Sequence, residues 1–394
     1  MFTIINDIYT MKIGIVCYPT YGGSGVVATE LGKALATKGH ELHFISYKKP
    51  ARLDPFSPNI FFHEVTITSY PLFEYPPYET ALASKLVELV KVQKLDVVHV
   101  HYAIPHASAA YLAKQILKAQ NIHIPVITTL HGTDISLVGK DDIFEPVVTF
   151  SINQSDGVTA VSDSLKEQTL AFFNIKKDIK VIPNFIDLES FRKYDKDHFK
   201  KAIAPKGEKI LMHISNFRKV KRVQDVVEIF YKVRQNMPAK LLMVGDGPER
   251  QTAQQMCRKL GDCNDVHFLG KQGAVGELLA VADLFLMPSE SESFGLAALE
   301  AMACQVPVIS SNAGGIPEIN IHGVTGFLSD IGNVEEMAAN ALFLLKSEEQ
   351  LAHFSKNSLQ QAKKFDIHHI VPIYEDFYKQ IIEESKIEEA CLNT

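Results

Sequence analysis

The fold is decided by one stretch, Ser289-Glu290-Ser291-Glu292-Ser293-Phe294-Gly295-Leu296-Ala297-Ala298-Leu299-Glu300, which follows the apolar run 284–287 and opens an alanine-rich segment. This order predicts a buried strand, a loop and the N-terminus of a helix. The first backbone N–H groups of a helix that begins near Gly295 have no partner inside the helix, so that end favours an anion. Glu292 precedes the helix and Glu300 lies about two turns along it, and carboxylates accept hydrogen bonds from sugar hydroxyls. The stretch therefore favours a sugar-nucleotide site over a protein-binding surface.

Length and composition indicate a globular protein with more than one domain. The chain has 394 residues, of which 46% are hydrophobic and 22% are charged. That length predicts two domains of roughly 180 residues each. The net charge of −6 argues against nucleic acid as the main partner, because binding to a phosphate backbone depends on clustered lysine and arginine.

The sequence also bears on location and on metals. No apolar run reaches the roughly 18 residues that span a bilayer, and no signal-peptide pattern opens the chain, so we expect no membrane insertion and a cytoplasmic location. Residues 1–10 precede a second methionine, Met11, and are expected to be a leader that reflects an upstream start codon. The five cysteines are an odd set without a Cys-x-x-Cys pair, which fits a reducing compartment and no structural zinc.

Short apolar runs alternate with helical patterns along the whole chain. The expected strands are residues 12–18, 41–45, 95–102, 125–130 and 157–161, followed by 210–214, 240–244, 266–269, 284–287, 307–310 and 326–328. Strands that alternate with helices form parallel sheets covered on both faces, with ligands outside the carboxyl ends of the strands. We therefore expect an α/β fold of two doubly wound domains, residues 11–187 and 188–365, and a C-terminal helix at 366–394.

A glycine-rich segment opens the first domain. Gly23-Ser24-Gly25-Val26-Val27-Ala28 follows the first expected strand and fits the G-x-G-x-x-A variant of the dinucleotide-binding motif. Glycines there let a backbone approach a phosphate closely. The next strand, 41–45, ends without a carboxylate for an adenine ribose, which counts against NAD and a dehydrogenase.

Polar residues directly after the expected strands are the site candidates of the first domain. They are His101-Tyr102, the run Thr129-Leu130-His131-Gly132-Thr133-Asp134, and Ser162. His131 is the strongest of them, although a histidine in such a place is about as often structural as functional. Metal binding by His99 and His101 is disfavoured, because no cysteine or acid cluster accompanies them.

A basic segment follows the first expected strand of the second domain. Within five residues it holds four cations, Arg218, Lys219, Lys221 and Arg222. Like charges at this spacing repel each other unless an anion lies among them. A solvated loop is the alternative, but the segment lies at the carboxyl end of a strand, on the same rim as Glu292, which favours an anion site.

Several motifs resemble those of a known family. Glu-Ser-Phe-Gly at 292–295, Leu-Glu-Ala-Met-Ala at 299–303, Pro307-Val308-Ile309 and Gly314-Gly315-Ile316-Pro317-Glu318 resemble the donor-site signature of the retaining glycosyltransferases of the GT-B fold, family four. The alternative, a helix capped by Ser289 with both acids solvated, does not account for so long a match. The resemblance implies two Rossmann-like domains facing across a cleft, with the last helix crossing back to the first domain.

The resemblance also implies roles for individual residues. A cation pair, Arg218 and Lys221, would hold the diphosphate in place of a divalent metal, while His131 and Glu292 would lie beside the donor sugar. In the commoner family spacing the arginine lies nearer the position of Asn216, so either Arg218 or Asn216 takes that place. The remaining donor-binding candidates are Gly23, Ser24, Gly25, Gly245, Ser293, Phe294, Gly295, Leu296 and Glu300, the last accepting from the ribose. Polar residues on the rim of the first domain, Ser24, Tyr102, Thr129 and Thr133, are the acceptor-binding candidates.

Further pieces resemble one member of this family along nearly the whole chain from Met11. They are Tyr18-Pro19 with Gly22-Gly23-Ser24-Gly25, Tyr75-Pro76-Pro77-Tyr78, residues 101–107 and residues 215–222. They imply a metal-independent transfer of GlcNAc from UDP-GlcNAc to L-malate with retention, the first step of bacillithiol biosynthesis, and a homodimer is one assembly compatible with it. Three alternatives stay open: another acceptor, a UDP-GlcNAc epimerase, and a non-catalytic sugar-nucleotide sensor.

Overall fold

The computed structural model describes residues 10–20, 22–54, 56–67, 75–137, 141–194, 197–261 and 263–392. Residues 1–9 of the expected leader and Tyr21 of the glycine-rich segment lie outside them. The described chain forms two compact units: unit 1 runs up to Pro183 and resumes at His368, and unit 2 is Asn184–Ile367. The expected boundaries, after residues 187 and 365, lie within four residues of these.

Unit 1 is built on a parallel sheet. Among the described residues it has seven strands in the order β3-β2-β1-β4-β5-β6-β7. The strands are β1 (Lys12–Val16), β2 (Glu41–Ser46), β3 (Ile60–Glu64), β4 (Val97–His101), β5 (Val126–Leu130), β6 (Gly157–Ala160) and β7 (Lys180–Val181). Val98 and Val100 face a core shared with helices α2 and α3, so His99 and His101 face the opposite side of the sheet.

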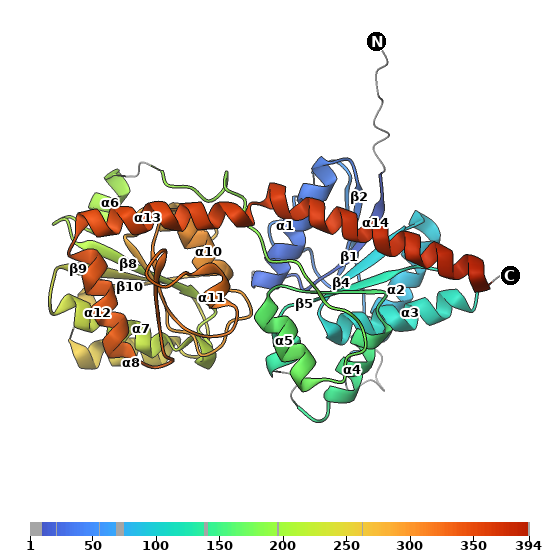
Figure 1. The fold of residues 1–394 in the computed structure, drawn as a ribbon, viewed down its shortest axis with the longest axis horizontal. Helices are drawn as coiled ribbons and strands as arrows, with labels where there is room; N and C mark the ends of the chain where they lie inside the picture. Colours follow the sequence, from blue (N-terminus) through green and yellow to red (C-terminus); the bar gives the residue numbers. More distant parts are fainter. Residues whose placement is uncertain are drawn as a thin grey trace, which may run out of the picture. The chain divides into compact units, whose positions relative to one another are not determined.

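Helices cover both faces of this sheet. They are α1 (Gly23–Thr37), α2 (Tyr78–Gln93), α3 (Ser108–Lys118), α4 (Glu145–Gln154), α5 (Asp163–Phe172) and α14 (Ile367–Leu392), with the short turns η1 (Ala103–Ala107) and η2 (Thr133–Leu137). The C-terminal helix α14, drawn red in Figure 1, lies against β4 and β6. Its Tyr378 hydroxyl is 2.8 Å from Nδ1 of His99, and Phe377 lies against Gly157.

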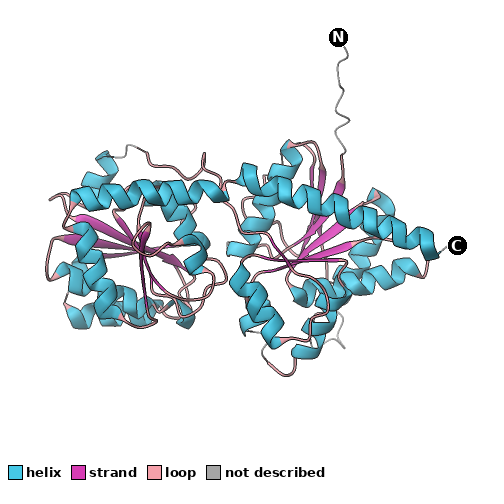
Figure 2. Cartoon of the chain, viewed as in Figure 1, coloured by secondary structure: helices cyan, strands magenta, loops and turns pink. Residues whose placement is uncertain are grey.

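Unit 2 repeats the architecture with a parallel sheet of six strands in the order β10-β9-β8-β11-β12-β13 among its described residues. Its strands are β8 (Lys209–Ser215), β9 (Ala239–Gly245), β10 (Val266–Gly270), β11 (Leu284–Met287), β12 (Val308–Ser311) and β13 (Gly326–Ser329). Its helices are α6 (Asp197–Ile203), α7 (Val223–Arg234), α8 (Arg250–Leu260), α9 (Val275–Leu279), α10 (Leu296–Ala303), α11 (Ile316–Ile319), α12 (Val334–Leu345) and α13 (Glu348–Ala362), with η3 (Lys219–Lys221), η4 (Cys263–Asp265) and η5 (Lys363–Phe365). Figure 2 shows the strands enclosed by helices in each unit.

The expected fold class is confirmed, and every expected strand is present. Two strands were not expected: β3, which is half-exposed at an edge of its sheet, and β7, which has two residues. Among the described residues, no helix is both long and apolar enough to cross a membrane.

The expected glycine loop of unit 1 is wrong in its detail, because helix α1 already begins at Gly23. Gly25 lies in the first turn, where a Cβ would stand 2.6 Å from the carbonyl oxygens of Tyr18 and Thr20. The glycine at this position is therefore required for close contact between the helix and the segment after β1.

Candidate functional site

The candidate site of unit 2 centres on an ion pair between two residues predicted to bind different parts of a ligand. Nζ of Lys221 lies 2.6 Å from Oε1 of Glu292, and the side chains are 19% and 12% exposed. The hydroxyl of Ser289 donates to the same oxygen at 2.9 Å. Oε2 of Glu292 has no partner among the described residues. The pair thus holds both side chains and leaves one carboxylate oxygen available.

Backbone contacts fix the segment that carries Glu292. The N–H of Gly315 donates to the carbonyl oxygen of Glu292 at 2.9 Å, and the N–H of Glu290 donates to that of Val220 at 2.7 Å. Gly314 has a φ of +55°, and a Cβ there would lie 2.0 Å from the carbonyl oxygen of Glu292. Only glycine fits so close an approach. The expected Gly314-Gly315 motif therefore packs directly against the backbone of Glu292 and fixes its position.

The expected helix N-terminus is present at Gly295. This residue has a φ of +95° and precedes α10, and no side chain among those described caps the helix there. The first N–H groups of α10 are thus offered to an anion, as the sequence predicts. Ser293 and Leu296 flank this turn and are partly exposed. Ser289, the capping residue of the alternative interpretation, instead bonds Glu292.

Two further donor candidates have different surroundings. Phe294 is buried, with its ring 5.6 Å from that of Phe365 in a T-shaped contact, so only its backbone can reach a ligand. Glu300, on α10, is 8% exposed. Gly245 ends β9 opposite Ser215, the last residue of β8, and belongs to the same edge of the sheet.

The basic segment separates into cations with and without partners. Arg222 pairs with Asp225 of the following helix at 2.6 Å. Arg218 and Lys219 are exposed and have no side-chain partner among the described residues, and Asn216 is exposed as well. Lys219–Lys221 form the short turn η3, so the side chains of this segment do not alternate as they would along an extended strand. The pairing of Arg222 has its own cause, since Arg222 directly precedes α7 and Asp225 lies in the first turn of that helix.

His213, which no sequence motif indicated, supports this edge. Its Nδ1 donates to the carbonyl oxygen of Leu286 at 2.8 Å, and its Nε2 lies 2.8 Å from the hydroxyl of Ser215. Burial, with the positive charge of Lys221 as a smaller cause, lowers the pKa of His213 to about 4. The ring is therefore neutral at pH 7 and links β8 to β11. A histidine inside a predicted buried strand was the available signal.

The candidate site of unit 1 gathers around Tyr102. Its hydroxyl donates to Oγ of Ser24 at 2.7 Å, which joins two acceptor candidates that are 78 residues apart. Tyr102 has a φ of +87°, a conformation that costs a non-glycine residue about 1–3 kcal/mol and is found mostly at functional sites. Gly23, Ser24 and Gly25 form the first turn of α1 beside it. Thr133 begins η2 and is partly exposed.

Asp134, which lies in the run after β5, is a second residue whose role the sequence does not indicate. One of its carboxylate oxygens accepts from the N–H of Ala103 at 2.9 Å, and the other accepts from those of Gly132 and His131 at 3.0 and 3.3 Å. It therefore ties the segment after β4 to the segment after β5. Burial raises its pKa to about 6 in spite of these hydrogen bonds, which oppose the shift.

A buried network of histidines and hydroxyls lies beneath these residues. Nε2 of His131 is 2.8 Å from Nδ1 of His101, while Nε2 of His99 is 2.6 Å from Oγ1 of Thr129. Thr129 is fully buried, and its hydroxyl also contacts that of Thr159 at 2.6 Å. Ser162, the remaining polar residue after a strand, caps α5 by accepting from the N–H of Leu165.

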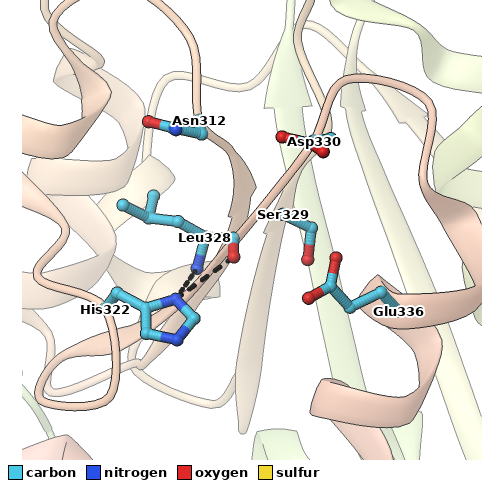
Figure 3. Close-up of a pocket in the computed structure, with 6 residues that line it drawn as sticks. All are labelled: Asn312, His322, Leu328, Ser329, Asp330 and Glu336. Carbon is cyan, nitrogen blue, oxygen red and sulfur yellow. Dashed lines mark hydrogen bonds between the residues drawn. The ribbon is translucent and has the colours of Figure 1, made fainter.

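An open cavity of about 280 Å³ lies elsewhere on unit 2 (Figure 3). Figure 3 shows His322 with its Nδ1 against Leu328, whose N–H donates to it at 3.1 Å, and Glu336 reaching toward the cavity from α12. None of the predicted site residues lines it. No group of three or more His, Cys, Asp or Glu side chains in the described part of the chain is arranged to hold a metal ion.

Comparison with known proteins identifies the family. Residues 21–190 match the family model "Glycosyltransferase Family 4", and residues 195–361 match "Glycosyl transferases group 1". The N-acetyl-alpha-D-glucosaminyl L-malate synthase of Bacillus anthracis is 50% identical over 378 residues, which cover 95% of this chain and 98% of that protein. An uncharacterized glycosyltransferase of Methanocaldococcus jannaschii, MJ1607, is 30% identical over 80% of this chain and 84% of its own length.

Solved structures agree in fold. Anabaena HepE in complex with UDP and glucose superimposes with a TM-score of 0.81 at 21% identity, over 94% of this chain and 99% of that one. A sucrose-phosphate synthase from Thermosynechococcus elongatus has a TM-score of 0.79 at 19% identity, over 95% and 100%. With two family models and a relative half identical over nearly its whole length, the chain belongs to the glycosyltransferases that join a family-4 first domain to a group-1 second domain.

Proposed function

We propose that this enzyme transfers GlcNAc from UDP-GlcNAc to the hydroxyl of L-malate, with retention at the anomeric carbon, and releases GlcNAc-malate and UDP. The observation that carries the proposal is the 50% identity to the malate synthase over 98% of that protein's length. The reaction would be the first step of bacillithiol biosynthesis, as the resemblance implies. The residues at the two sheet edges supply the chemistry that such a transfer requires.

The proposed donor groups of unit 2 act on the charge of the leaving group. The departing UDP gains negative charge at its diphosphate in the transition state, and fixed cations and N–H groups near that charge lower the barrier. Lys221, held by Glu292, and the exposed guanidinium of Arg218 are the proposed cations. The first N–H groups of α10, from Gly295 and Leu296, add the partial positive charge of a helix N-terminus.

Glu292 has a double part in this proposal. Oε1 accepts hydrogen bonds from Lys221 and Ser289, while Oε2 accepts a hydrogen bond from a hydroxyl of the donor sugar. One side chain then fixes the sugar and orients the cation that meets the phosphate. Glu300 accepts from the ribose, and Asn216, Gly245 and Ser293 line the nucleotide.

The proposed acceptor groups lie on unit 1. Ser24, Tyr102 and Thr133 carry hydrogen-bonding atoms at the carboxyl edge of the sheet, and His131, which the resemblance puts beside the donor sugar, follows β5 at the same edge. Thr129 is not carried into these contacts, because its buried hydroxyl is already bonded twice. Malate has two carboxylates, and the exposed Lys48 and Lys49, which follow β2 at the same edge, are the proposed source of positive charge.

Metal independence belongs to the proposal as well. Arg218 and Lys221 provide the positive charge that a divalent ion provides in other transferases. We expect EDTA to leave the rate unchanged, and a loss of activity restored by Mg²⁺ or Mn²⁺ contradicts this part. The cytoplasm as location and the homodimer stay predictions, the latter to be measured by sedimentation equilibrium.

The reaction is tested by product analysis with UDP-GlcNAc and different acceptors. L-Malate should give GlcNAc-malate and UDP, while D-malate, lactate and inositol phosphate should react far more slowly, since polar groups of the site are left unpaired. If lactate or inositol phosphate equals L-malate in kcat/KM, the acceptor is wrong. Release of UDP from donor alone, with an epimerised sugar, indicates an epimerase. Binding without turnover indicates a sensor.

A further inference from the structure

His131 has one ring nitrogen hydrogen-bonded, and its other ring nitrogen meets no partner in the ranges that the structure describes. It follows β5, is 7% exposed, and its Nε2 lies 2.8 Å from Nδ1 of His101, the last residue of β4. Nδ1 of His131 has no partner among the described residues. The two rings are stacked with their centroids 5.0 Å apart, and the ring centroids of His99 and His101 are 4.4 Å apart.

Both rings are neutral at pH 7. Burial lowers the pKa of His131 to about 3 and that of His101 well below its ordinary value, and neighbouring histidines lower both further. In a hydrogen bond between two neutral imidazoles, one nitrogen carries the proton and the other accepts it. Each ring therefore exists as one of two tautomers, and the choice in one ring fixes the choice in the other.

The surroundings of His101 favour one direction. Its Nε2 is completely buried and has no hydrogen-bond partner in the described part of the chain. If Nε2 carried the proton, a buried N–H donor would be left unpaired, which is rarer in proteins than an under-used acceptor. The better arrangement protonates Nδ1 of His101, which then donates to Nε2 of His131.

We propose that His101 is a positioning residue, which donates through Nδ1–H to Nε2 of His131 and thereby fixes His131 as the tautomer with its proton on Nδ1. His131 then offers an N–H donor to a substrate oxygen, and it does not act as a base at that nitrogen. The substrate in question is that of the proposed function, on which this step rests. The tautomer itself does not depend on it.

The tautomer is tested directly by NMR of protein labelled with ¹⁵N-histidine, because protonated and bare ring nitrogens have well-separated shifts. We expect His131 to show a protonated Nδ1 and a bare Nε2, with its signals assigned from their absence in His131→Gln. A protonated Nε2 on His131 overturns the proposal. This measurement needs no substrate, so it holds even if the assays show that the proposed reaction does not occur.

Three substitutions of His101 separate positioning from space filling. In His101→Asn the side-chain amide nitrogen takes the place of Nδ1, in His101→Gln it reaches the place of Nε2, and His101→Leu has no donor. We expect kcat/KM to fall about tenfold or more in the Leu and Gln variants and to stay within about threefold in the Asn variant, as one positioned hydrogen bond is lost or kept. The Nδ1–H tautomer of His131 should survive only with Asn.

A matched control exists on another strand of unit 1. His43 is 1% exposed and its Nδ1 lies 2.8 Å from Nε2 of His63, so His43→Leu removes an equivalent bond outside the candidate site, together with the bond from Nε2 to Glu41 at 2.9 Å. It should lower Tm and leave kcat/KM unchanged. Equal losses in the Asn and Leu variants of His101, or wild-type kcat/KM with an unchanged tautomer in the Leu variant, overturn the proposal. If His101→Leu does not fold, the comparison of Asn with Gln decides.

Discussion

The two units carry chemically opposite groups at the carboxyl edges of similar sheets. In unit 2 the edge is ionic: Lys221 and Glu292 face each other at 2.6 Å on segments that keep some exposure. In unit 1 the groups around Tyr102 form a neutral edge: the Tyr102 hydroxyl donates to Ser24, and the His131 ring is hydrogen-bonded to His101 of a completely buried network. A leaving diphosphate requires opposing charge, whereas an attacking hydroxyl requires a fixed position.

Burial produces this difference. His99 is covered by Tyr378 of α14, and His101, His106 and His131 are buried as well, so the charged forms of these four rings are unfavourable. The cations of unit 2 lie in the turn between β8 and α7, where Arg218 and Lys219 reach solvent. Sheets of the same architecture thus differ in electrostatics: buried side chains stay neutral in unit 1, and side chains in an exposed turn stay charged in unit 2.

The largest effect is expected in acid. Burial lowers the pKa of His99 and His131 to about 3 and of His106 to about 4, from the ordinary 6.5, and lowers that of His101 as well. Each group stabilises the fold above pH 6.5, and this contribution is lost as the pH falls from 6.5 toward the folded value, by about 1.4 kcal/mol per pH unit. The raised pKa of Asp134 acts in the opposite sense between pH 6 and 4 and offsets one of the four.

In unit 2, His213 is the comparable histidine at the candidate edge. The four histidines of unit 1 lie in or after β4 and β5, so acid should destabilise these strands more than it destabilises β8, which carries His213. Hydrogen exchange at pH 7 and pH 5, measured peptide by peptide, should show that amide protection is lost first in β4 and β5. If peptides from β8 and β11 open first, the contrast between the two edges is wrong.

The next effect concerns charge at the edge of unit 2. Lys221→Ala should lower kcat by about 10² or more, since it removes a cation from the position where charge develops. Lys219→Ala, in the same turn but exposed and without a partner among the described residues, is the control and should change kcat little. Steady-state rates of the two variants make the test, and equal losses mean that the wrong cation has been chosen.

The two acids should then divide turnover from binding. Glu292→Ala loses the sugar contact and leaves Lys221 without its partner, so kcat should fall by about tenfold or more, because these contacts change at the reacting centre. Glu300→Ala should mainly raise the Kd for UDP. The exposed Glu290 gives the control, Glu290→Ala, with both values near those of the wild type. A large loss of kcat in the Glu300 variant at unchanged donor affinity refutes this division.

The smallest effect should come from the neutral edge. Tyr102→Phe removes the hydroxyl that donates to Ser24 and should lower kcat/KM for the acceptor about fivefold, the value of one neutral hydrogen bond. Tyr111→Phe, whose ring contacts Phe150 on the helical surface of unit 1, is the matched control. A loss near 10² for Tyr102→Phe would show that the neutral edge contributes as much as the ionic one.

Sequence patterns were informative where one segment determines its own structure. The β-branched runs predicted the central strands, and the position of Gly295 predicted the start of α10. The edge strand β3 was missed because Phe61 and Glu64 are exposed, so the run lacks the pattern of a buried strand. The start of α1 was misplaced because glycines suggest a loop, although Gly25 serves close contact within a helix.

The candidate sites were predictable as residues but not as contacts. Lys221 and Glu292 were both selected, yet their pairing across 71 positions depends on β8 and β11 lying side by side. The bond between Tyr102 and Ser24 and the pair of His101 and His131 likewise require the order of strands in the sheet. The role of Asp134 was not predictable, because its three N–H donors come from two separate segments of the chain.

The course of the chain through the two units has a consequence for synthesis on the ribosome. Unit 2 is one uninterrupted stretch, Asn184–Ile367, whereas unit 1 needs the residues from His368 onward. Until that last helix has emerged, His99 lacks Tyr378, and Gly157 lacks the Phe377 ring that covers it. We therefore expect unit 2 to complete its fold first although it is translated second, and nascent chains that end before His368 to leave unit 1 open to proteolysis and to chaperones.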